Sequence, residues 1–172
     1  MSTDEELMLA FQGGSGEAFT ELFQRYRGRI YGFFRRRLGH PSRAEELAQE
    51  TFVAVLKAVE RYEPRALFRT YLYGIALNLL AAERRKSGRE VVETKPTDPA
   101  AAGDAESALC IRDAVQRLEA TDREILLLRE YEQLSYEEIA HVLRLQVNTV
   151  RSRLFRARLA LRHLLVARTQ GT

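Results

Sequence analysis

The residues of this chain best suited to bind a ligand are the arginines near its C-terminus. After Glu138 the sequence holds no aspartate or glutamate. A solvated helix usually mixes both signs of charge, because opposite charges pair one turn apart. Arginine without acids instead suits a polyanion such as DNA, since each guanidinium can displace a counterion condensed on phosphate. The sequence therefore predicts a DNA-binding segment with seven arginines: Arg144, Arg151, Arg153, Arg156, Arg158, Arg162 and Arg168.

Two helices joined by a brief turn would hold these arginines. The stretch LSYEEIAHVL contains Ser135 and Glu138, which have the spacing of a capping box. After the break at Arg144-Leu145-Gln146, a second helix carries polar and basic residues opposite an apolar stripe. This arrangement predicts a helix-turn-helix, although the pattern alone leaves open a helical hairpin with a solvated basic face. The stripe consists of Val147, Val150, Leu154, Ala157 and Leu161.

Other chemistries have little support in the sequence. His40, His141 and His163 are scattered away from any ligand cluster, so we expect no metal ion. No glycine-rich phosphate loop and no nucleophile elbow occurs. Cys110 is the only cysteine, and its apolar helical neighbours predict a small buried side chain and not a redox sensor. We therefore expect no cofactor, no catalytic residue and no enzyme activity.

The composition is that of a soluble globular protein. Of the 172 residues, 45% are hydrophobic and 30% are charged. The net charge is only +3, so binding of DNA would depend on local patches. No apolar run is long enough to cross a bilayer, and the acidic start MSTDEEL is unlike a signal peptide. We expect a cytoplasmic protein without membrane insertion.

Helix signals dominate both ends of the chain, so the predicted fold class is all-α, with two small helical domains joined by a flexible linker. Besides Ser135, capping-box spacing predicts helix starts at Ser2, Ser42 and Thr121. Residues 1–86 form the first predicted domain, and residues 108–172 form the second, which contains the helix-turn-helix. Residues 87–107 hold two prolines, little periodicity and an acidic excess, which indicates a flexible acidic linker.

Three long helices are expected in the first domain. The first ends near Gly39, the second runs from Ser42 to the break at Glu63-Pro64, and the third runs from about Leu67 to Lys86. The predicted buried stripes are, in the same order, Phe19, Leu22, Phe23, Tyr26, Ile30 and Phe33; Ala44, Leu47, Ala48, Phe52, Val55, Leu56 and Val59; and Phe68, Tyr71, Leu72, Ile75 and Leu79.

With these blocks in place, four segments resemble the extracytoplasmic function (ECF) sigma factors, the smallest two-domain members of the sigma-70 family of bacterial RNA polymerase. RAEELAQETFVAVLKAVERYEP is similar to the polymerase-binding helix of that family, with its Gln-Glu-x-Phe segment. FRTYLYGIALNLLAAERRK is similar to the promoter-melting helix. LSYEEIAHVL and VNTVRSRLFRARLALR are similar to the reader of the upstream promoter element. The order and spacing of all four segments, across nearly the whole chain, make the resemblance specific.

The resemblance implies partners: core RNA polymerase, promoter DNA and an anti-sigma factor. The linker would thread into the polymerase channel. Docking on the clamp helices of the polymerase would use an apolar anchor with a charged rim. The residues implied are Glu46, Leu47, Gln49, Glu50 and Phe52. Leu47 and Phe52 are equally compatible with an ordinary place in the core.

The resemblance also implies two DNA surfaces. The melting helix and the loop Arg61–Phe68 would capture bases of one separated strand of the downstream element, by stacking and hydrogen bonding. The residues implied there are Arg65, Phe68, Tyr71, Asn78, Arg84 and Arg85. On the duplex upstream element they are Gln146, Asn148, Thr149, Arg151, Ser152, Phe155 and Arg156. Tyr71 could instead belong to the core.

Some positions depart from the family pattern. Tyr71 stands where tryptophan is frequent, and Leu77 where arginine is frequent. Arg144-Leu145 replaces the usual glycine of the turn, and Gln146 replaces the usual serine cap. The chain is expected to direct promoter recognition, DNA melting and transcription initiation together with core RNA polymerase. The alternative is a stand-alone helix-turn-helix regulator that binds duplex DNA without the polymerase.

Overall fold

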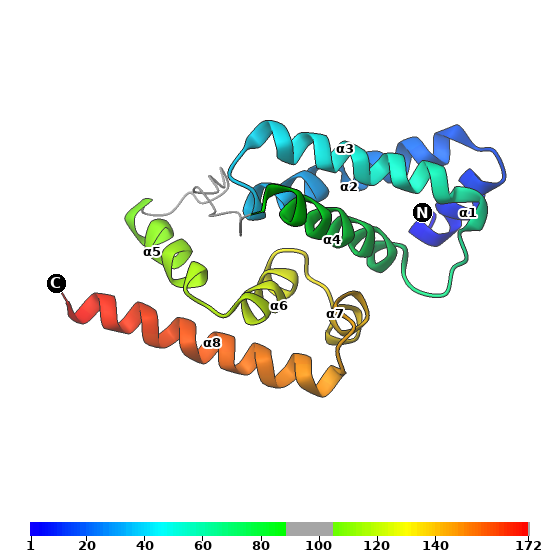
Figure 1. Cartoon of the computed structure of the whole chain (residues 1–172). Coiled ribbons are helices and arrows are strands. Elements are labelled where there is room, and N and C mark those ends of the chain that lie inside the picture. Colours follow the sequence, from blue (N-terminus) through cyan, green and yellow to red (C-terminus); the bar gives the residue numbers. More distant parts are fainter. Residues whose placement is uncertain (89–104, 172) are drawn as a thin grey trace. The chain divides into compact units, whose positions relative to one another are not determined.

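A computed structural model of the chain describes residues 1–88 and 105–171 (Figure 1). Within these ranges the regular structure is entirely helical, as predicted. The chain divides into two units, Met1–Thr97 and Asp98–Thr172. Most of the predicted linker, residues 89–104, lies outside the described residues. Its predicted ends belong to helices, because one helix reaches Ser87 and the next begins at Ala105.

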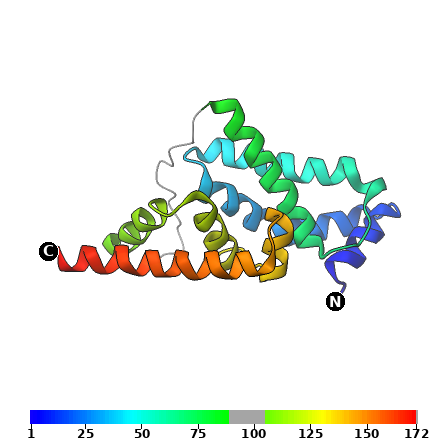
Figure 2. The ribbon, with the colours of Figure 1, turned by 60° about the horizontal axis from the view of Figure 1, so that its bottom comes forward.

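In unit 1, residues 1–88 form four α-helices and a short 3-10 helix. The helix α1 packs on α2, which packs on α3, and α3 in turn packs on α4 (Figures 1 and 2). Aromatic rings fill the centre: Phe33 lies against Phe34 and against Tyr73 of α4. The bounds are Asp4–Gln12 for α1, Gly16–Arg37 for α2, Pro41–Ala58 for α3, Val59–Arg61 for the 3-10 helix η1, and Phe68–Ser87 for α4.

Unit 2 is built around one long helix, α8, against which the three shorter helices pack. Its core holds Ile125, Leu128, Ile139, Val150 and Leu154, all at most 1% exposed. Cys110, predicted to be a small buried side chain, is only partly buried. The bounds are Ala105–Gln116 for α5, Ala120–Glu130 for α6, Tyr136–Leu143 for α7 and Val147–Gln170 for α8. None of the helices in the described ranges is both long and apolar enough to cross a membrane.

The helix starts agree with the predicted capping boxes in one of four cases. At α7 the box is complete: the Ser135 amide donates to Glu138 at 2.7 Å, and the Glu138 amide donates to the Ser135 hydroxyl at 3.1 Å. At α1 the box is formed one residue later than predicted, by Thr3 and Glu6. The helix α3 begins at Pro41 instead of after Ser42, because proline fits the first helical position without needing a cap.

The start of α6 and the buried stripes of α3 and α4 also differ from prediction. Glu119, and not Thr121, caps α6 by accepting a hydrogen bond from the Asp122 amide. In α3, Leu56 is 41% exposed and Thr51 is buried in its place, since the Thr51 hydroxyl donates to the Leu47 carbonyl at 2.8 Å. In α4 the stripe is rotated by one residue: Tyr71, Ile75 and Leu79 are half-buried, whereas Tyr73, Ala76 and Leu80 are buried.

Candidate nucleic-acid interface

The turn between α7 and α8 depends on a left-handed residue. Arg144 ends α7 with φ 55° and ψ 45°, a conformation that glycine adopts more easily than any other residue. The amide of Leu145 then donates to the Ala140 carbonyl at 2.9 Å, which closes the helix end. Gln146 precedes α8 without a side-chain cap, as its residue type predicted. The turn is therefore formed in spite of arginine at its tightest position.

The first turns of α8 present a polar face opposite a buried stripe. Val150, Leu154 and Ala157 are at most 1% exposed and hold the helix in unit 2. On the other side, the aromatic ring of Phe155 is 69% exposed. The predicted contact residues around it are exposed, apart from the half-buried Thr149: Gln146, Asn148, Arg151, Ser152 and Arg156. The surface predicted to read DNA is thus accessible to a partner.

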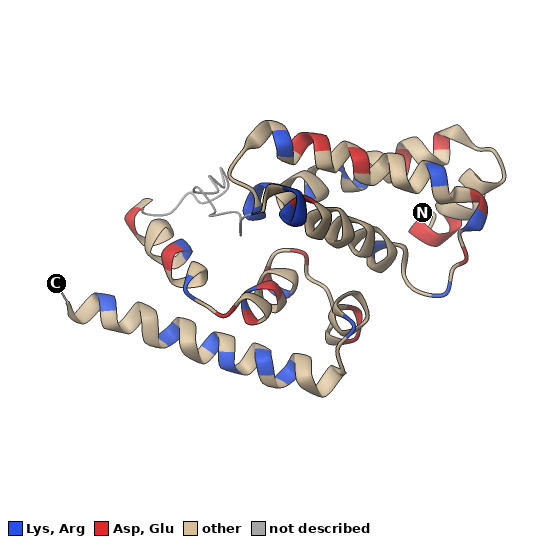
Figure 3. Cartoon of the chain, viewed as in Figure 1, with Lys and Arg blue, Asp and Glu red and all other residues tan. Residues whose placement is uncertain are grey.

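Some of the seven arginines of this region form ion pairs with acidic residues of the same unit. Arg153 binds Glu119 at 3.0 Å and Asp122 at 2.9 Å, so it ties α8 to the start of α6. Arg158 binds Glu130 at 2.8 Å, and this bond raises the Arg158 pKa. In Figure 3, α8 carries basic residues while acidic residues lie on α5, α6 and α7. Part of the one-signed charge seen in the sequence is therefore neutralised within the unit.

The arginines near the start of α8 remain more available. Arg156 has a 61% exposed side chain and only a long 3.8 Å contact with Asp122. The Arg151 guanidinium lies 5.9 Å from the centre of the Tyr136 ring, which leaves its hydrogen-bond donors unused by that contact. Both lie on the same exposed face as Phe155. These two guanidiniums are therefore accessible to a partner.

In unit 1, the predicted downstream contacts fall into two groups. Phe68 is only 1% exposed and packs edge-on against Tyr26, with ring centres 5.6 Å apart. In this structure the ring of Phe68 therefore lies in the core, and its contact with DNA stays a prediction. Tyr71 is half-buried, and burial raises its pKa. Its ring centre lies 5.2 Å from that of Tyr62, so Tyr71 borders both the core and the surface.

The other downstream candidates are exposed. The side chain of Arg65 is 84% exposed on the loop before α4, where it pairs with Glu63 at 2.5 Å. Asn78 is exposed on α4, and Arg84 and Arg85 are exposed near the end of that helix. The exposed candidates therefore lie on the loop, in the middle of α4 and at its end.

The polymerase-binding candidates on α3 also separate by burial. Glu46, Gln49 and Glu50 are exposed, whereas Leu47 is 1% and Phe52 5% exposed. The two apolar residues were predicted to serve both the core and docking, and in this structure they serve the core. The middle of α3 exposes three acids, Glu45, Glu46 and Glu50, with Gln49 between them, and Val53 and Leu56 are exposed further along. Figure 3 shows the acidic and basic residues of the helix.

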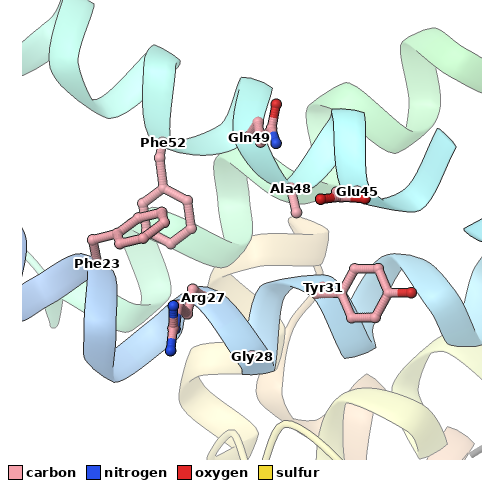
Figure 4. A pocket seen from close by; sticks show the side chains of 8 residues that line it. All are labelled: Phe23, Arg27, Gly28, Tyr31, Glu45, Ala48, Gln49 and Phe52. Carbon is pink, nitrogen blue, oxygen red and sulfur yellow. The ribbon is translucent and has the colours of Figure 1, made fainter. Parts of the chain in front are cut away.

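Beside this face lies a groove that the sequence analysis missed. It has a volume of about 440 Å³ and runs between α2 and α3 (Figure 4). Gly28 and Ala48 leave space in its middle, and a β-carbon on Gly28 would meet no atom within 4 Å. The rings of Phe23 and Phe52 meet at one end, 4.9 Å apart. The remaining lining residues are Arg27, Tyr31, Glu45 and Gln49.

No group of three or more His, Cys, Asp and Glu side chains that could hold a metal ion occurs among residues 1–88 and 105–171. The candidate residues lie on exposed surfaces: on α3 and on α4 with its preceding loop in unit 1, and on α8 in unit 2. Surfaces of this kind bind macromolecules.

Comparisons with known proteins relate both units to the same protein family. Residues 22–90 match the model of Sigma-70 region 2, and residues 108–161 match that of Sigma-70, region 4. The chain is 33% identical over 177 residues to the RNA polymerase sigma-H factor of Pseudomonas aeruginosa, covering 92% of this chain and 91% of the relative. It is 31% identical over 167 residues to the ECF RNA polymerase sigma factor SigW of Bacillus subtilis, covering 87% and 89%.

A solved structure is similar as well. The sigma factor RpoE of Bartonella quintana, crystallised in complex with the anti-sigma factor NepR, superposes with a TM-score of 0.73 at 26% identity. The similarity covers 86% of this chain and 96% of that one.

Proposed function

This chain belongs to the ECF group of the sigma-70 family, and we propose that its two units divide the work of a sigma factor between the surfaces described above. Sigma factors bind core RNA polymerase and promoter DNA, and they direct transcription initiation. In this chain, unit 1 would contact the polymerase and open the downstream element, and unit 2 would read the upstream element. The observation that carries this division is the exposed face of α8, where Phe155 and Arg156 project from a helix whose other side is buried.

On the upstream element, α8 would enter the major groove through its first turns. An arginine can make two hydrogen bonds to the edge of guanine, and Arg151 and Arg156 are the candidates for this contact. Phe155 is too apolar and too exposed for a side chain that only meets water, and contact with a thymine methyl group or a sugar would cover it. Gln146, Asn148, Thr149 and Ser152 would supply the remaining contacts. The hydroxyl of Ser152 already donates to the Thr149 carbonyl at 3.1 Å, so it would act mainly as an acceptor.

On the polymerase, the exposed residues Glu46, Gln49 and Glu50 would form the contact surface. Leu47 and Phe52 would act from behind by holding α3 in place, since so little of either is exposed. The groove between α2 and α3 would extend this surface with the apolar anchor that a helix-on-helix interface needs.

On the downstream element, the exposed residues Arg65, Asn78, Arg84 and Arg85 would bind the separated strand. Tyr71 would offer its half-buried aromatic ring for stacking in place of the frequent tryptophan. Phe68 would support Tyr71 and Tyr62 from the core. Opening of the duplex would then rest on binding energy alone, since captured bases offset the cost of unstacking.

Two further expectations follow from family membership. The linker would follow the polymerase channel, and an anti-sigma factor would restrain this chain, as NepR is bound to RpoE in the solved complex. The chain would act by binding and not by covalent chemistry, and it would act in the cytoplasm, where the polymerase is.

A gel-shift experiment tests the proposal against a stand-alone regulator. The labelled duplex carries both promoter elements, and the chain is added alone or with core RNA polymerase. A sigma factor gives a sequence-specific complex only with the polymerase. A specific complex formed by the chain alone, unchanged when the polymerase is added, would contradict the proposal.

A further inference from the structure

We propose that α1 is a positioning element for the loop that precedes α4, and that Glu5 and Gln12 hold the two ends of this loop ready for the downstream promoter strand. The inference rests on the proposed function, because that function assigns the loop and α4 to the downstream element. It gives a role to α1, which lies before residue 22, where the match to the model of Sigma-70 region 2 begins. Figures 1 and 2 show α1 beside the loop that joins η1 to α4.

Gln12, at the end of α1, holds the start of the loop. Its side-chain Nε2 donates toward three backbone carbonyls: Val59 at 2.9 Å, Glu60 at 3.3 Å and Tyr62 at 3.1 Å. An amide nitrogen carries two hydrogens, so the three carbonyls share these donors. The Val59 carbonyl also accepts a hydrogen bond from the Tyr62 amide at 3.1 Å, which closes η1, so Gln12 binds both the end of η1 and the first residue of the loop. One side chain thus fixes the direction in which the chain leaves η1.

Glu5, in the first turn of α1, holds the end of the loop. Its Oε1 accepts a hydrogen bond from the backbone amide of Phe68 at 2.6 Å. Phe68 is the first residue of α4, and Leu67 before it provides no side-chain cap. A carboxylate at a helix N-terminus satisfies a free amide and is favoured by the helix dipole. The cap that α4 lacks in its own sequence therefore comes from a helix 63 positions earlier.

The helix α1 is itself firmly attached, so it can serve as a reference for the loop. Leu7 and Met8 are 6% and 0% exposed in the core. Asp4 binds Arg25 at 2.7 Å and also accepts a hydrogen bond from the Tyr26 hydroxyl. The Thr3–Glu6 capping box completes the first turn.

Between its two fixed ends the loop is exposed. Tyr62 is 5% exposed and anchors the base of the loop among the aromatic rings, whereas Glu63, Pro64, Arg65 and Leu67 are exposed. A loop that is held at both ends loses less conformational freedom when it binds a flipped base, and this preorganisation strengthens binding. Without the side chain of Glu5 or of Gln12, the loop would lose more conformational freedom when it binds the base, and binding would be weaker.

The test uses the full chain assembled with core RNA polymerase. Fluorescent single-stranded oligonucleotides carry the downstream element or a scrambled sequence, and the readout is the ratio of the two affinities. We expect this ratio to fall about five-fold in Glu5→Ala and in Gln12→Met, because the loop must be ordered on binding. Glu5→Gln keeps an acceptor oxygen for the Phe68 amide and should retain most of the ratio. Glu17→Ala, which removes an exposed acid in the first turn of α2, is the matched control.

Two further readouts separate positioning from a general loss of structure. Trypsin cleavage at Arg65 should become faster in Glu5→Ala and Gln12→Met, while binding of a duplex upstream element by the holoenzyme stays unchanged. If the wild-type holoenzyme discriminates between the oligonucleotides and both variants discriminate equally well, the role of α1 is disproved while the proposed function stands. If the wild-type holoenzyme itself does not discriminate, the downstream assignment is wrong and the inference is wrong with it.

Discussion

Arg43 of α3 and Glu83 of α4 form a two-pronged ion pair, with Nε donating to Oε1 at 2.8 Å and Nη2 donating to Oε2 at 2.6 Å. The same guanidinium reaches Glu46 at 2.7 Å and Glu50 at 3.3 Å on the exposed face of α3. One arginine therefore joins the helix proposed to meet the polymerase to the end of the helix proposed to bind the downstream strand. The hydrogen bond from Arg43 lowers the pKa of Glu83.

The first prediction concerns the stability of unit 1. Glu83→Gln should lower the free energy of unfolding by about 1 kcal/mol at neutral pH, because the pair is bidentate but only partly buried. The pKa of Glu83 is lower in the folded than in the unfolded chain. Its stabilising effect is therefore fully present above the ordinary pKa of 4.5 and is lost as the pH falls through the lowered value.

Urea denaturation followed by circular dichroism at pH 7 and at about pH 3 measures this difference. The gap between wild type and Glu83→Gln should close at the lower pH. Glu45→Gln, an exposed carboxylate on α3, is the control and should leave stability at neutral pH nearly unchanged. A gap of equal size at both pH values would mean that the charge of Glu83 does not contribute.

The second prediction concerns the turn of the helix-turn-helix. Arg144→Gly should raise the stability of unit 2 by about 0.5–1 kcal/mol, because glycine adopts a positive φ without the steric cost that a β-carbon brings. Arg144→Ala removes the same charge but keeps the β-carbon, so it should give no such gain. Thermal melts of the wild type, Arg144→Gly and Arg144→Ala measure this difference. Equal melting temperatures for the glycine and alanine variants would refute the argument from backbone strain.

The third prediction concerns assembly with the polymerase. Glu50→Arg should weaken co-purification with core RNA polymerase at moderate salt, because it reverses a charge on the exposed face of α3. Since Glu50 is exposed and its contact with Arg43 is long, the circular dichroism melt should change little. Glu17→Arg makes the same charge reversal on α2 and should co-purify normally. Normal co-purification of Glu50→Arg would remove this face of α3 from the interface.

The fourth prediction separates reading from gripping on α8. Arg156→Ala should lower transcription mainly from promoters with the native upstream element, since an arginine–guanine pair contributes about 1–3 kcal/mol of discrimination. Arg162→Ala, further along the exposed side of α8, should instead change the salt dependence of binding. Arg153→Ala breaks the contacts with Glu119 and Asp122, so its main effect should be on folding. Equal, sequence-independent losses in Arg156→Ala and Arg162→Ala would mean that α8 binds DNA without reading it.

Local signals in the sequence were sufficient for part of the fold. The Ser135–Glu138 box depends on residues within one turn and is present as predicted. Of the predicted stripe on α8, Val150, Leu154 and Ala157 are buried, whereas Val147 and Leu161 are half-buried. Periodicity was less decisive for α4, because apolar residues lie on most sides of that helix. The choice of Tyr73 over Tyr71 for the core depends on Phe33 of another helix.

Burial and contacts that depend on how the helices pack could not be predicted. Arg37 ends a run of three arginines and has the sequence pattern of a solvated residue, yet it is fully buried. Its guanidinium donates to the Phe33 carbonyl at 3.0 Å and lies 3.8 Å from the centre of the Phe33 ring. The sequence around Glu5 and Gln12 likewise gives no signal that these side chains bind the loop before α4. The groove between α2 and α3 depends on Gly28 of α2 and Ala48 of α3 lining the same space, which the sequence does not show.

The most direct test of the central claim is transcription in vitro with core RNA polymerase over a genomic DNA library, with the start sites determined by sequencing. The claim predicts that adding this chain creates start sites absent with core polymerase alone, and that the DNA before them shares two sequence elements at a constant spacing. With Arg156→Ala, the start sites should share a less well-defined upstream element and an unchanged downstream element. The absence of new start sites, with specific binding of duplex DNA by the chain alone, would contradict the claim.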